Sequence, residues 1–268
     1  MTDDNLSRCC SASGSSLNKV LEFVMSNQLI DNAVLVTGAG RRVGYHIALR
    51  LHQDGYRVVA HYRTHTDEIQ ALSDLGIKTI QAELSSTDTI LAFIEQLKAC
   101  CHNFRALIHN ASSFSPTLDD VEEAAKQYEQ FFYVHMMAPF LINQSLHNIL
   151  VGDSNEAADI IHITDINVEN PTARFDIYGT TKAGLHNLML AQAKKFAPNI
   201  KVNAIAPGPV LFTEMHSQAV KQQMLNETLL AKEGGAEPVY LAIKSLLDNP
   251  FMTGASIPVD GGRRLSKA

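Results

Sequence analysis

The chain has 268 residues, of which 46% are hydrophobic and 19% are charged. This composition supplies enough apolar side chains for a full core and excludes wholesale disorder. The 22 basic and 28 acidic side chains give a net charge of −6, so the sequence predicts no attraction to nucleic acid or to an anionic membrane.

Residues 1–30 show no helical or strand period, and residues 11–16 are nearly all Ser, Ala and Gly. We expect this segment to be an N-terminal arm. Its acidic start, at Asp3 and Asp4, is unlike a secretory signal. Met25 closely precedes the first predicted strand and is an alternative start codon, which would place the arm upstream of the true start.

From residue 33 onward, apolar runs of strand length alternate with segments that carry apolar residues at helical spacing. Strands are predicted at residues 33–37, 57–61, 78–81, 106–109, 159–164, 201–205 and 256–259. Helices are predicted at residues 43–51, 66–75, 88–100, 118–133, 138–150, 178–196, 218–230 and 238–247. The alternation predicts one α/β domain over residues 31–268, a doubly wound, Rossmann-like parallel sheet with helices on both faces. Ligands of such sheets bind beyond the carboxyl ends of the strands.

The four cysteines form two adjacent pairs, Cys9-Cys10 and Cys100-Cys101. Neither pair has a further cysteine or histidine at metal-ligand spacing, so we predict no metal site. Adjacent cysteines rarely form a structural disulfide, which favours a reduced, cytoplasmic location. No stretch approaches 18 consecutive apolar residues, so no membrane-spanning helix is predicted.

A glycine-rich turn, Gly38-Ala39-Gly40-Arg41-Arg42-Val43-Gly44, joins the first predicted strand to the first predicted helix. Its small residues would allow backbone N–H groups and the helix N-terminus to approach a pyrophosphate. The glycine spacing departs from Gly-x-Gly-x-x-Gly. The alternative is therefore a glycine-rich turn that binds no ligand.

The end of the second predicted strand indicates which dinucleotide is bound. A site that prefers NAD places a carboxylate there to hold the ribose hydroxyls. This chain instead has Arg63 and Thr64, and no acid precedes Asp67. Arg63, together with Arg41, would pair with a 2′-phosphate, which favours NADPH or NADP as the cofactor. The alternative is that Arg63 is a solvated surface cation.

Tyr178 and Lys182 are four residues apart at the start of a predicted helix and share one of its faces. An ammonium group beside a phenol lowers the phenol pKa, which would make Tyr178 a proton donor near neutral pH. Tyr240 and Lys244 have the same spacing. No strand leads into that second pair, so we interpret Tyr240 as ordinary helix packing.

The order of motifs resembles the short-chain dehydrogenase/reductase family over most of the chain. The matching residues are Thr37-Gly38 with Gly44, Asn110-Ala111, Tyr178 with Lys182, Asn203 with Pro207-Gly208, and Val259-Asp260-Gly261-Gly262. Three departures resemble pteridine reductases: Arg42 replaces a glycine, Asp165 replaces the serine 13 residues before the tyrosine, and Phe114 follows Asn-Ala-Ser-Ser. Residues 61–65, 109–112 and 161–165 look most like the bacterial dihydromonapterin reductases.

The resemblance implies a homotetrameric enzyme that uses NADPH to reduce a dihydropterin to the tetrahydropterin, with weak dihydrofolate reductase activity. The expected cofactor contacts are Gly38, Arg41, Arg42, Val43, Arg63, Thr64, Glu83, Leu84, Asn110, Ala111, Ser112, Tyr178, Lys182, Pro207 and Gly208. The expected substrate contacts are Arg42, Ser112, Phe114, Asp165 and Tyr178. The expected catalytic residues are Tyr178, Lys182 and Asp165.

Charge and shape at these positions also favour a pterin. An ionised Asp165 would repel the oxygen of a simple ketone, on which negative charge develops, whereas a pterin offers amino and ring N–H donors. Phe114 would stack on the flat ring system. The alternatives are that Asp165 caps a loop and that Phe114 is a core aromatic. His135 stands where the family usually has an asparagine that holds a relay water, and either proton relay or simple packing fits it.

Two other functions stay open on the sequence alone. One is a short-chain reductase for a different carbonyl or quinone substrate. The other is an NADPH-binding regulator with weak or lost catalysis, marked by the unusual Asp165 and His135.

Overall fold

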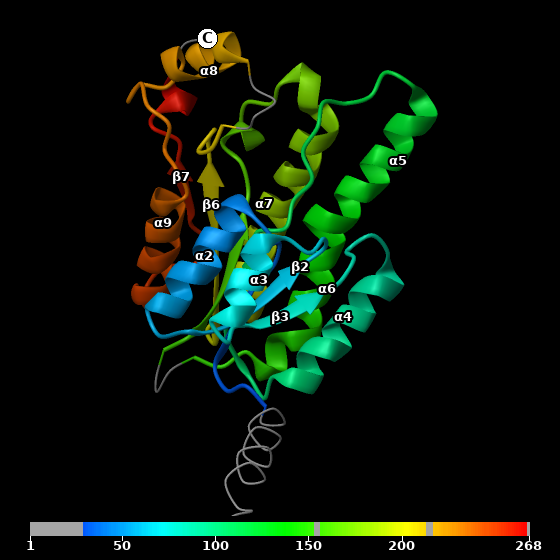
Figure 1. Cartoon of the computed structure of the whole chain (residues 1–268), viewed down its shortest axis with the longest axis vertical. Coiled ribbons are helices and arrows are strands. Elements are labelled where there is room, and N and C mark those ends of the chain that lie inside the picture. Colours follow the sequence, from blue (N-terminus) through cyan, green and yellow to red (C-terminus); the bar gives the residue numbers. More distant parts are fainter. Residues whose placement is uncertain (1–28, 153–155, 213–216, 267–268) are drawn as a thin grey trace, which may run out of the picture.

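The computed structural model describes residues 29–152, 156–212 and 217–266 (Figure 1). The N-terminal arm predicted for residues 1–30 lies outside these ranges except for residues 29 and 30. The cysteine pair Cys9-Cys10 also lies outside them.

A seven-stranded parallel sheet forms the centre of the molecule, as predicted. The strands are β1 (Ala33–Val36), β2 (Arg57–Tyr62), β3 (Lys78–Gln81), β4 (Phe104–His109), β5 (Ala158–Ile163), β6 (Ile200–Pro207) and β7 (Ser256–Val259). Their order is β3-β2-β1-β4-β5-β6-β7, and every neighbouring pair is parallel. The order reverses between β1 and β4, which is where such sheets bind ligands.

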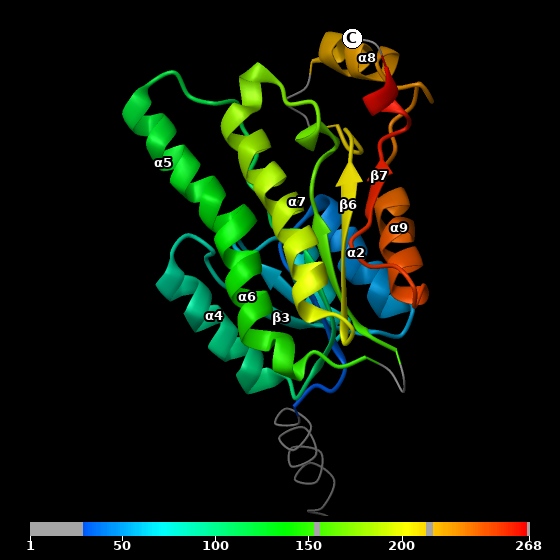
Figure 2. The same cartoon turned by 180° about the vertical axis from the view of Figure 1, so that it is seen from behind.

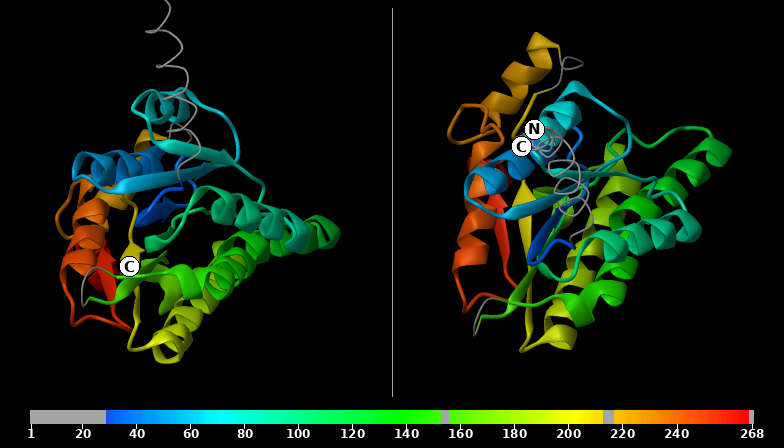
Figure 3. Two further views of the ribbon diagram at one scale, coloured as in Figure 1. Left: turned by 90° about the horizontal axis from the view of Figure 1, so that it is seen from below. Right: turned by 60° about the horizontal axis from the view of Figure 1, so that its bottom comes forward.

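Helices cover both faces of the sheet, which confirms the doubly wound arrangement. One face carries α2 (Arg42–Gln53), α3 (Asp67–Asp74) and α9 (Glu237–Asp248). The other carries α4 (Thr87–Cys100), α6 (Ala138–Leu146) and α7 (Asp176–Phe196), which lie together in Figure 2. Seen from below, the blue α2 and orange α9 lie on one side and the green and yellow helices on the other (Figure 3).

Apolar side chains from both faces of the strands fill two cores. Ile47 of α2, Ile69 of α3 and Ile243 of α9 pack on one face. Phe93 of α4 and Met189 of α7 pack on the other. Strands buried on both sides read as continuous apolar runs, which is why the sequence located them well.

A π-helical turn changes the prediction for residues 118–150. The two predicted helices are one continuous run, in which α5 (Val121–Phe132), a π-helix (Tyr133–Met137), α6 and a 3₁₀ turn (His147–Ile149) follow without a break. Pro139 lacks an N–H group and cannot bond one turn back, which is compatible with the wider turn before it. The helix predicted for 218–230 is also shorter, since α8 spans Gln218–Asn226.

Candidate active site

Two glycines that admit no side chain shape the turn between β1 and α2. Gly38 has a φ of +70°, and a Cβ there would lie 2.7 Å from the Cα of Ala111. A Cβ on Gly44 would lie 2.1 Å from the Gly38 carbonyl oxygen. Asn110, which follows β4, closes the turn because its amide donates to the carbonyl oxygens of Thr37 (3.1 Å) and Gly38 (3.0 Å). These contacts join the ends of β1 and β4 where the strand order reverses.

The amino end of α2 differs from those of the next helices. Side chains of Thr66, Ser86 and Asp120 cap α3, α4 and α5. Within the described ranges no side chain caps α2, which begins directly after Arg41. The first N–H groups of a helix have no partner inside it, so the amino end of α2 offers donors and the positive end of a helix dipole. Such a helix end suits a pyrophosphate, and the predicted residues Arg41, Arg42 and Val43 lie at it.

Arg42 combines an unusual backbone with a contact to the segment that follows β6. Its φ of +55° lies in the left-handed region that favours glycine. Its guanidinium Nη2 donates to the carbonyl oxygen of Leu211 at 3.1 Å. Arg42 therefore links the turn after β1 to the segment that follows β6.

Arg63 and Thr64 lie exposed just beyond β2. The Thr66 hydroxyl donates to the Gly40 carbonyl oxygen at 2.6 Å, which holds this segment against the glycine-rich turn. Arg41 is also exposed. The structure thus brings the segments that carry both arginines together at the rim of the site, with no carboxylate before Asp67 in the sequence.

Tyr178 lies buried at the start of α7, with 9% of its surface exposed. Its hydroxyl donates to Oδ2 of Asp165 at 2.9 Å. The other oxygen of Asp165, Oδ1, accepts from the N–H of Asn167 at 2.8 Å. Asp165 therefore does both things that the sequence suggested: it begins a 3₁₀ turn and it contacts the tyrosine.

The expected effect of Lys182 on Tyr178 is wrong for this arrangement. The Lys182 Nζ donates to the carbonyl oxygen of Ile163 at 2.8 Å and lies 5.8 Å from the centre of the Tyr178 ring. Burial and the Asp165 carboxylate raise the pKa of Tyr178 well above its ordinary value. Burial also lowers the pKa of Lys182 to about 8, against the opposing attraction of Asp165. Tyr178 is consequently a protonated phenol at neutral pH.

His135 is fully buried in the π-helix and connects three parts of the site. Its Nδ1 lies 2.8 Å from the hydroxyl of Thr181, and its Nε2 lies 2.8 Å from the hydroxyl of Ser112. The N–H of Ser113 also donates to Nε2, at 3.2 Å. The Thr181 hydroxyl itself donates to the Tyr178 carbonyl oxygen, so the hydrogen of the imidazole is on Nδ1. Burial lowers the pKa of His135 and keeps the ring neutral.

Phe114 is an exposed aromatic side chain beside Tyr178, with 61% of its surface accessible. It stacks on Phe175 with ring centres 4.7 Å apart and meets Tyr178 edge-on at 4.9 Å. The alternative that Phe114 belongs to the core is therefore wrong. An exposed aromatic face next to a proton donor suits a flat ligand.

The remaining predicted contacts lie at the carboxyl ends of the strands. Glu83 and Leu84 follow β3, Ala111 and Ser112 follow β4, and Pro207 and Gly208 end β6. A Cβ on Gly208 would lie 2.9 Å from the Cβ of Asp260. Tyr240 lies away from them in α9, buried, with its hydroxyl bonded to Asp54, which confirms its structural role.

Thr181 and Phe175 contact the candidate site residues His135 and Phe114, but the sequence analysis did not predict either of them. Both lie three residues from Tyr178, one on each side. Helical spacing places Thr181 beside Tyr178, so this signal was available. Phe175 precedes α7 in a 3₁₀ turn that the sequence pattern does not reveal.

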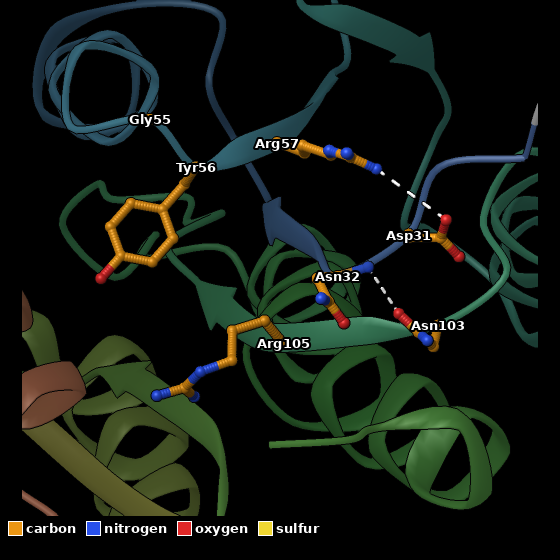
Figure 4. A pocket seen from close by; sticks show the side chains of 7 residues that line it. All are labelled: Asp31, Asn32, Gly55, Tyr56, Arg57, Asn103 and Arg105. Atoms are coloured by element: carbon orange, nitrogen blue, oxygen red, sulfur yellow. Dashed lines mark hydrogen bonds and ion pairs between the residues drawn. The ribbon is translucent and has the colours of Figure 1, made fainter. Parts of the chain in front are cut away.

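The amino ends of the strands hold a separate cavity of about 520 Å³ (Figure 4). Asn32, Tyr56 and Arg105 line it, and Arg57 pairs with Asp31 at its edge. None of the predicted site residues lines this cavity. It lies at the end of the sheet opposite the glycine-rich turn.

Among the residues that the structure describes, no helix is long and apolar enough to cross a membrane. The same residues contain no group of three or more His, Cys, Asp or Glu side chains that could hold a metal ion.

The parallel sheet, the uncapped α2 and the Tyr178-Lys182 pair together define a dinucleotide-dependent oxidoreductase. The family model for short chain dehydrogenases matches residues 32–224, and the chain belongs to that family. A dihydromonapterin reductase of Escherichia coli strain K12 is 37% identical over 237 residues, covering 87% of this chain and 96% of that protein. Another, from Citrobacter koseri, is 38% identical over the same length. The resemblance seen in the sequence motifs is thereby confirmed.

Proposed function

We propose that this chain uses NADPH to reduce a dihydropterin, of the 7,8-dihydromonapterin kind, to the tetrahydropterin, with weak activity on dihydrofolate. The observation that carries the proposal is the 2.9 Å hydrogen bond from Tyr178 to Asp165 beside the exposed ring of Phe114. The names of the relatives from Escherichia coli and Citrobacter koseri support the same substrate.

The glycine-rich turn and the uncapped α2 would hold the cofactor pyrophosphate. Arg41 and Arg63, on adjoining exposed segments, would pair with the 2′-phosphate. When bound, NADPH supplies the hydride that adds to C6 of the pterin. Asn110 follows β4, and Lys182 of α7 donates to the carbonyl oxygen of Ile163 at the end of β5, so both would border the nicotinamide half.

Tyr178 would donate the proton that N5 of the pterin requires. The neighbouring carboxylate keeps the phenol protonated until it reacts, because two adjacent anions are unfavourable. For the same reason, the phenolate left beside Asp165 after the transfer would take up a proton from solvent, to which this carboxylate is partly exposed. Asp165 would also accept hydrogen bonds from the pterin amino and ring N–H groups, while Phe114 would stack on the ring.

Steady-state assays test this function. Purified protein should oxidise NADPH in the presence of 7,8-dihydromonapterin or dihydrobiopterin. The rate with NADPH should exceed the rate with NADH, and the rate with either dihydropterin should exceed the rate with dihydrofolate. No turnover with any dihydropterin would contradict the proposal. Activity confined to a 3-oxo or quinone panel would indicate a different short-chain reductase, and NADPH binding without any turnover would indicate a regulator.

Replacing Asp165 with serine is expected to change substrate preference. Asp165→Ser should lower kcat/KM for the dihydropterin by roughly 10- to 100-fold, because charge-assisted hydrogen bonds to the substrate are lost. Turnover of simple ketones should rise, because a hydroxyl can donate to their oxygen. Asp176→Asn, at the exposed start of α7, is the control and should change neither rate. Unchanged dihydropterin activity in Asp165→Ser would be the contrary result.

Two variants of Arg42 should separate its backbone conformation from its side-chain contact. Both Arg42→Gly and Arg42→Ala remove the guanidinium and should raise the KM for NADPH by about tenfold. Arg42→Gly should nevertheless unfold with a free energy about 1 kcal/mol higher than Arg42→Ala, because glycine adopts the φ of +55° without strain. Urea unfolding measures this difference, and equal stabilities would argue against strain at residue 42.

The assembly is proposed to be a homotetramer and its location the cytoplasm. Support for the assembly comes from exposed apolar side chains along α5 and α6: Val121, Tyr128, Phe132 and Phe140. Such a patch suits burial against a second copy of the chain. Sedimentation equilibrium at micromolar concentration tests the stoichiometry.

A further inference from the structure

His61 is a buried histidine that contacts three other elements near the cofactor cradle. It lies near the end of β2 with 2% of its surface exposed. The N–H of Gly38, in the glycine-rich turn, donates to its Nδ1 at 3.1 Å. Its Nε2 lies 3.2 Å from the carbonyl oxygen of Ala82, just after β3. Its ring packs against Phe93 of α4, with centres 4.7 Å apart.

These partners determine the state of the imidazole. A backbone N–H can only donate and a carbonyl oxygen can only accept, so the hydrogen is on Nε2 and the lone pair is on Nδ1. Burial lowers the pKa of His61 to about 4. The ring is therefore neutral at physiological pH and keeps the lone pair that receives the Gly38 N–H.

The backbone of His61 adds a second contact to the same turn. Its carbonyl oxygen accepts from the N–H of Ala39 at 2.8 Å. One residue thus accepts hydrogen bonds from two successive N–H groups of the turn, Gly38 and Ala39, whereas no side chain caps the start of α2 in the described residues. On its other side, His61 contacts Ala82, which immediately precedes Glu83 and Leu84, two of the predicted cofactor contacts.

We propose that His61 is a positioning residue for the dinucleotide: it sets the spacing between the glycine-rich turn at Gly38 and the segment after β3 that carries Glu83 and Leu84. It contacts neither the nicotinamide end nor the pterin site in the described structure, so its effect falls on cofactor affinity. This inference rests on the proposed function only in that a dinucleotide occupies the cleft.

Three substitutions dissect the two side-chain hydrogen bonds. In His61→Asn the amide oxygen stands near the place of Nδ1 and can still accept from Gly38. In His61→Gln the amide nitrogen stands near the place of Nε2 and can still donate to Ala82. His61→Phe removes both bonds and keeps an aromatic ring against Phe93. His65→Gln, at an exposed position three residues after the end of β2, is the matched control.

Direct binding of NADPH, followed by its fluorescence without any pterin, is the primary measurement. The dissociation constant should rise roughly tenfold or more in His61→Phe, as expected for the loss of at least one hydrogen bond. It should rise less in His61→Asn than in His61→Gln, and stay unchanged in His65→Gln. In steady state, the KM for NADPH should rise in parallel, while kcat at saturating NADPH and the KM for the dihydropterin stay within about threefold.

Several results would overturn this role. A dissociation constant within twofold of wild type in all folded His61 variants would do so, as would equal losses in His61→Asn and His61→Gln. If His61→Phe does not fold, the Asn and Gln pair still decides. A wild-type chain that binds NADPH but reduces no dihydropterin would refute the proposed function and leave the His61 comparison intact. A chain that binds neither NADPH nor NADH would refute both.

Discussion

Tyr178→Phe is expected to lower kcat for dihydropterin reduction by roughly 10²- to 10⁴-fold, the usual contribution of a general acid. Phenylalanine keeps the ring that contacts Phe114 and His135 but has no proton to give. The dissociation constant for NADPH should change by less than about threefold. This combination separates loss of chemistry from loss of the binding site, and stopped-flow single turnovers together with NADPH titration measure it.

Tyr240→Phe is the matched control for this experiment. Tyr240 has the same spacing to a lysine, but it packs between α9 and α2, with Arg50 over its ring and its hydroxyl bonded to Asp54. Its loss should reduce stability and leave kcat near the wild-type value. If Tyr178→Phe retained more than about a tenth of the wild-type kcat, the assignment of Tyr178 as proton donor would be wrong.

Acidification is expected to destabilise the folded chain strongly between about pH 6.5 and pH 4. Burial lowers the pKa of His61 and of His109 from 6.5 to about 4. In the unfolded chain both would titrate near 6.5, so below that pH the unfolded state binds more protons than the folded state. Their contribution to stability is complete above pH 6.5 and is lost as the pH falls toward 4, where the loss levels off.

The size of this effect is large relative to the stability of an ordinary domain. A shift of about 2.5 pH units corresponds to about 3 kcal/mol for each histidine. A typical domain is stable by about 5 to 15 kcal/mol, so two such groups account for a large part of it. His135 and His162 are also buried with lowered pKa values and add to the loss.

Urea unfolding at a series of pH values from 4 to 8 measures this dependence. His109→Gln is the informative variant, because its amide nitrogen can still donate to Oδ1 of Asn143, which lies 2.7 Å from Nε2 of the histidine. That variant should lose less stability than wild type on acidification. Parallel curves for the two proteins would show that His109 is not a source of the acid sensitivity.

Much of the fold could be predicted because its signals are local. Leu35 and Ile161 belong to strands that are buried on both faces, and such strands are short runs of apolar residues in the sequence. The glycine-rich turn at Gly38 can be recognised from residue types alone. The same holds for the pair of Tyr178 and Asp165, which are 13 residues apart in the sequence and form a hydrogen bond. Where a role depends on residue type and order, sequence was sufficient.

Other properties depend on three-dimensional surroundings and could not be predicted. The sequence predicts a lowered pKa for Tyr178, but the pKa is raised, because burial and the Asp165 carboxylate disfavour the phenolate and the Lys182 ammonium lies 5.8 Å from the ring centre. His135 forms a hydrogen bond with Ser112, and His61 forms one with Gly38. In both cases the partner lies 23 positions away in the chain. No periodicity signals such pairs.

The π-helical turn at Tyr133–Met137 sets the rotation of α5 relative to α6. Each residue of a helix rotates the chain by about 100°, so deleting one residue from this turn would swing α5 around relative to α6. The imidazole bridge to Thr181 would then point away from α7, although the seven strands would keep their pairing. The extra residue of the π-helical turn thus gives α5 and α6 different rotations about one continuous helix.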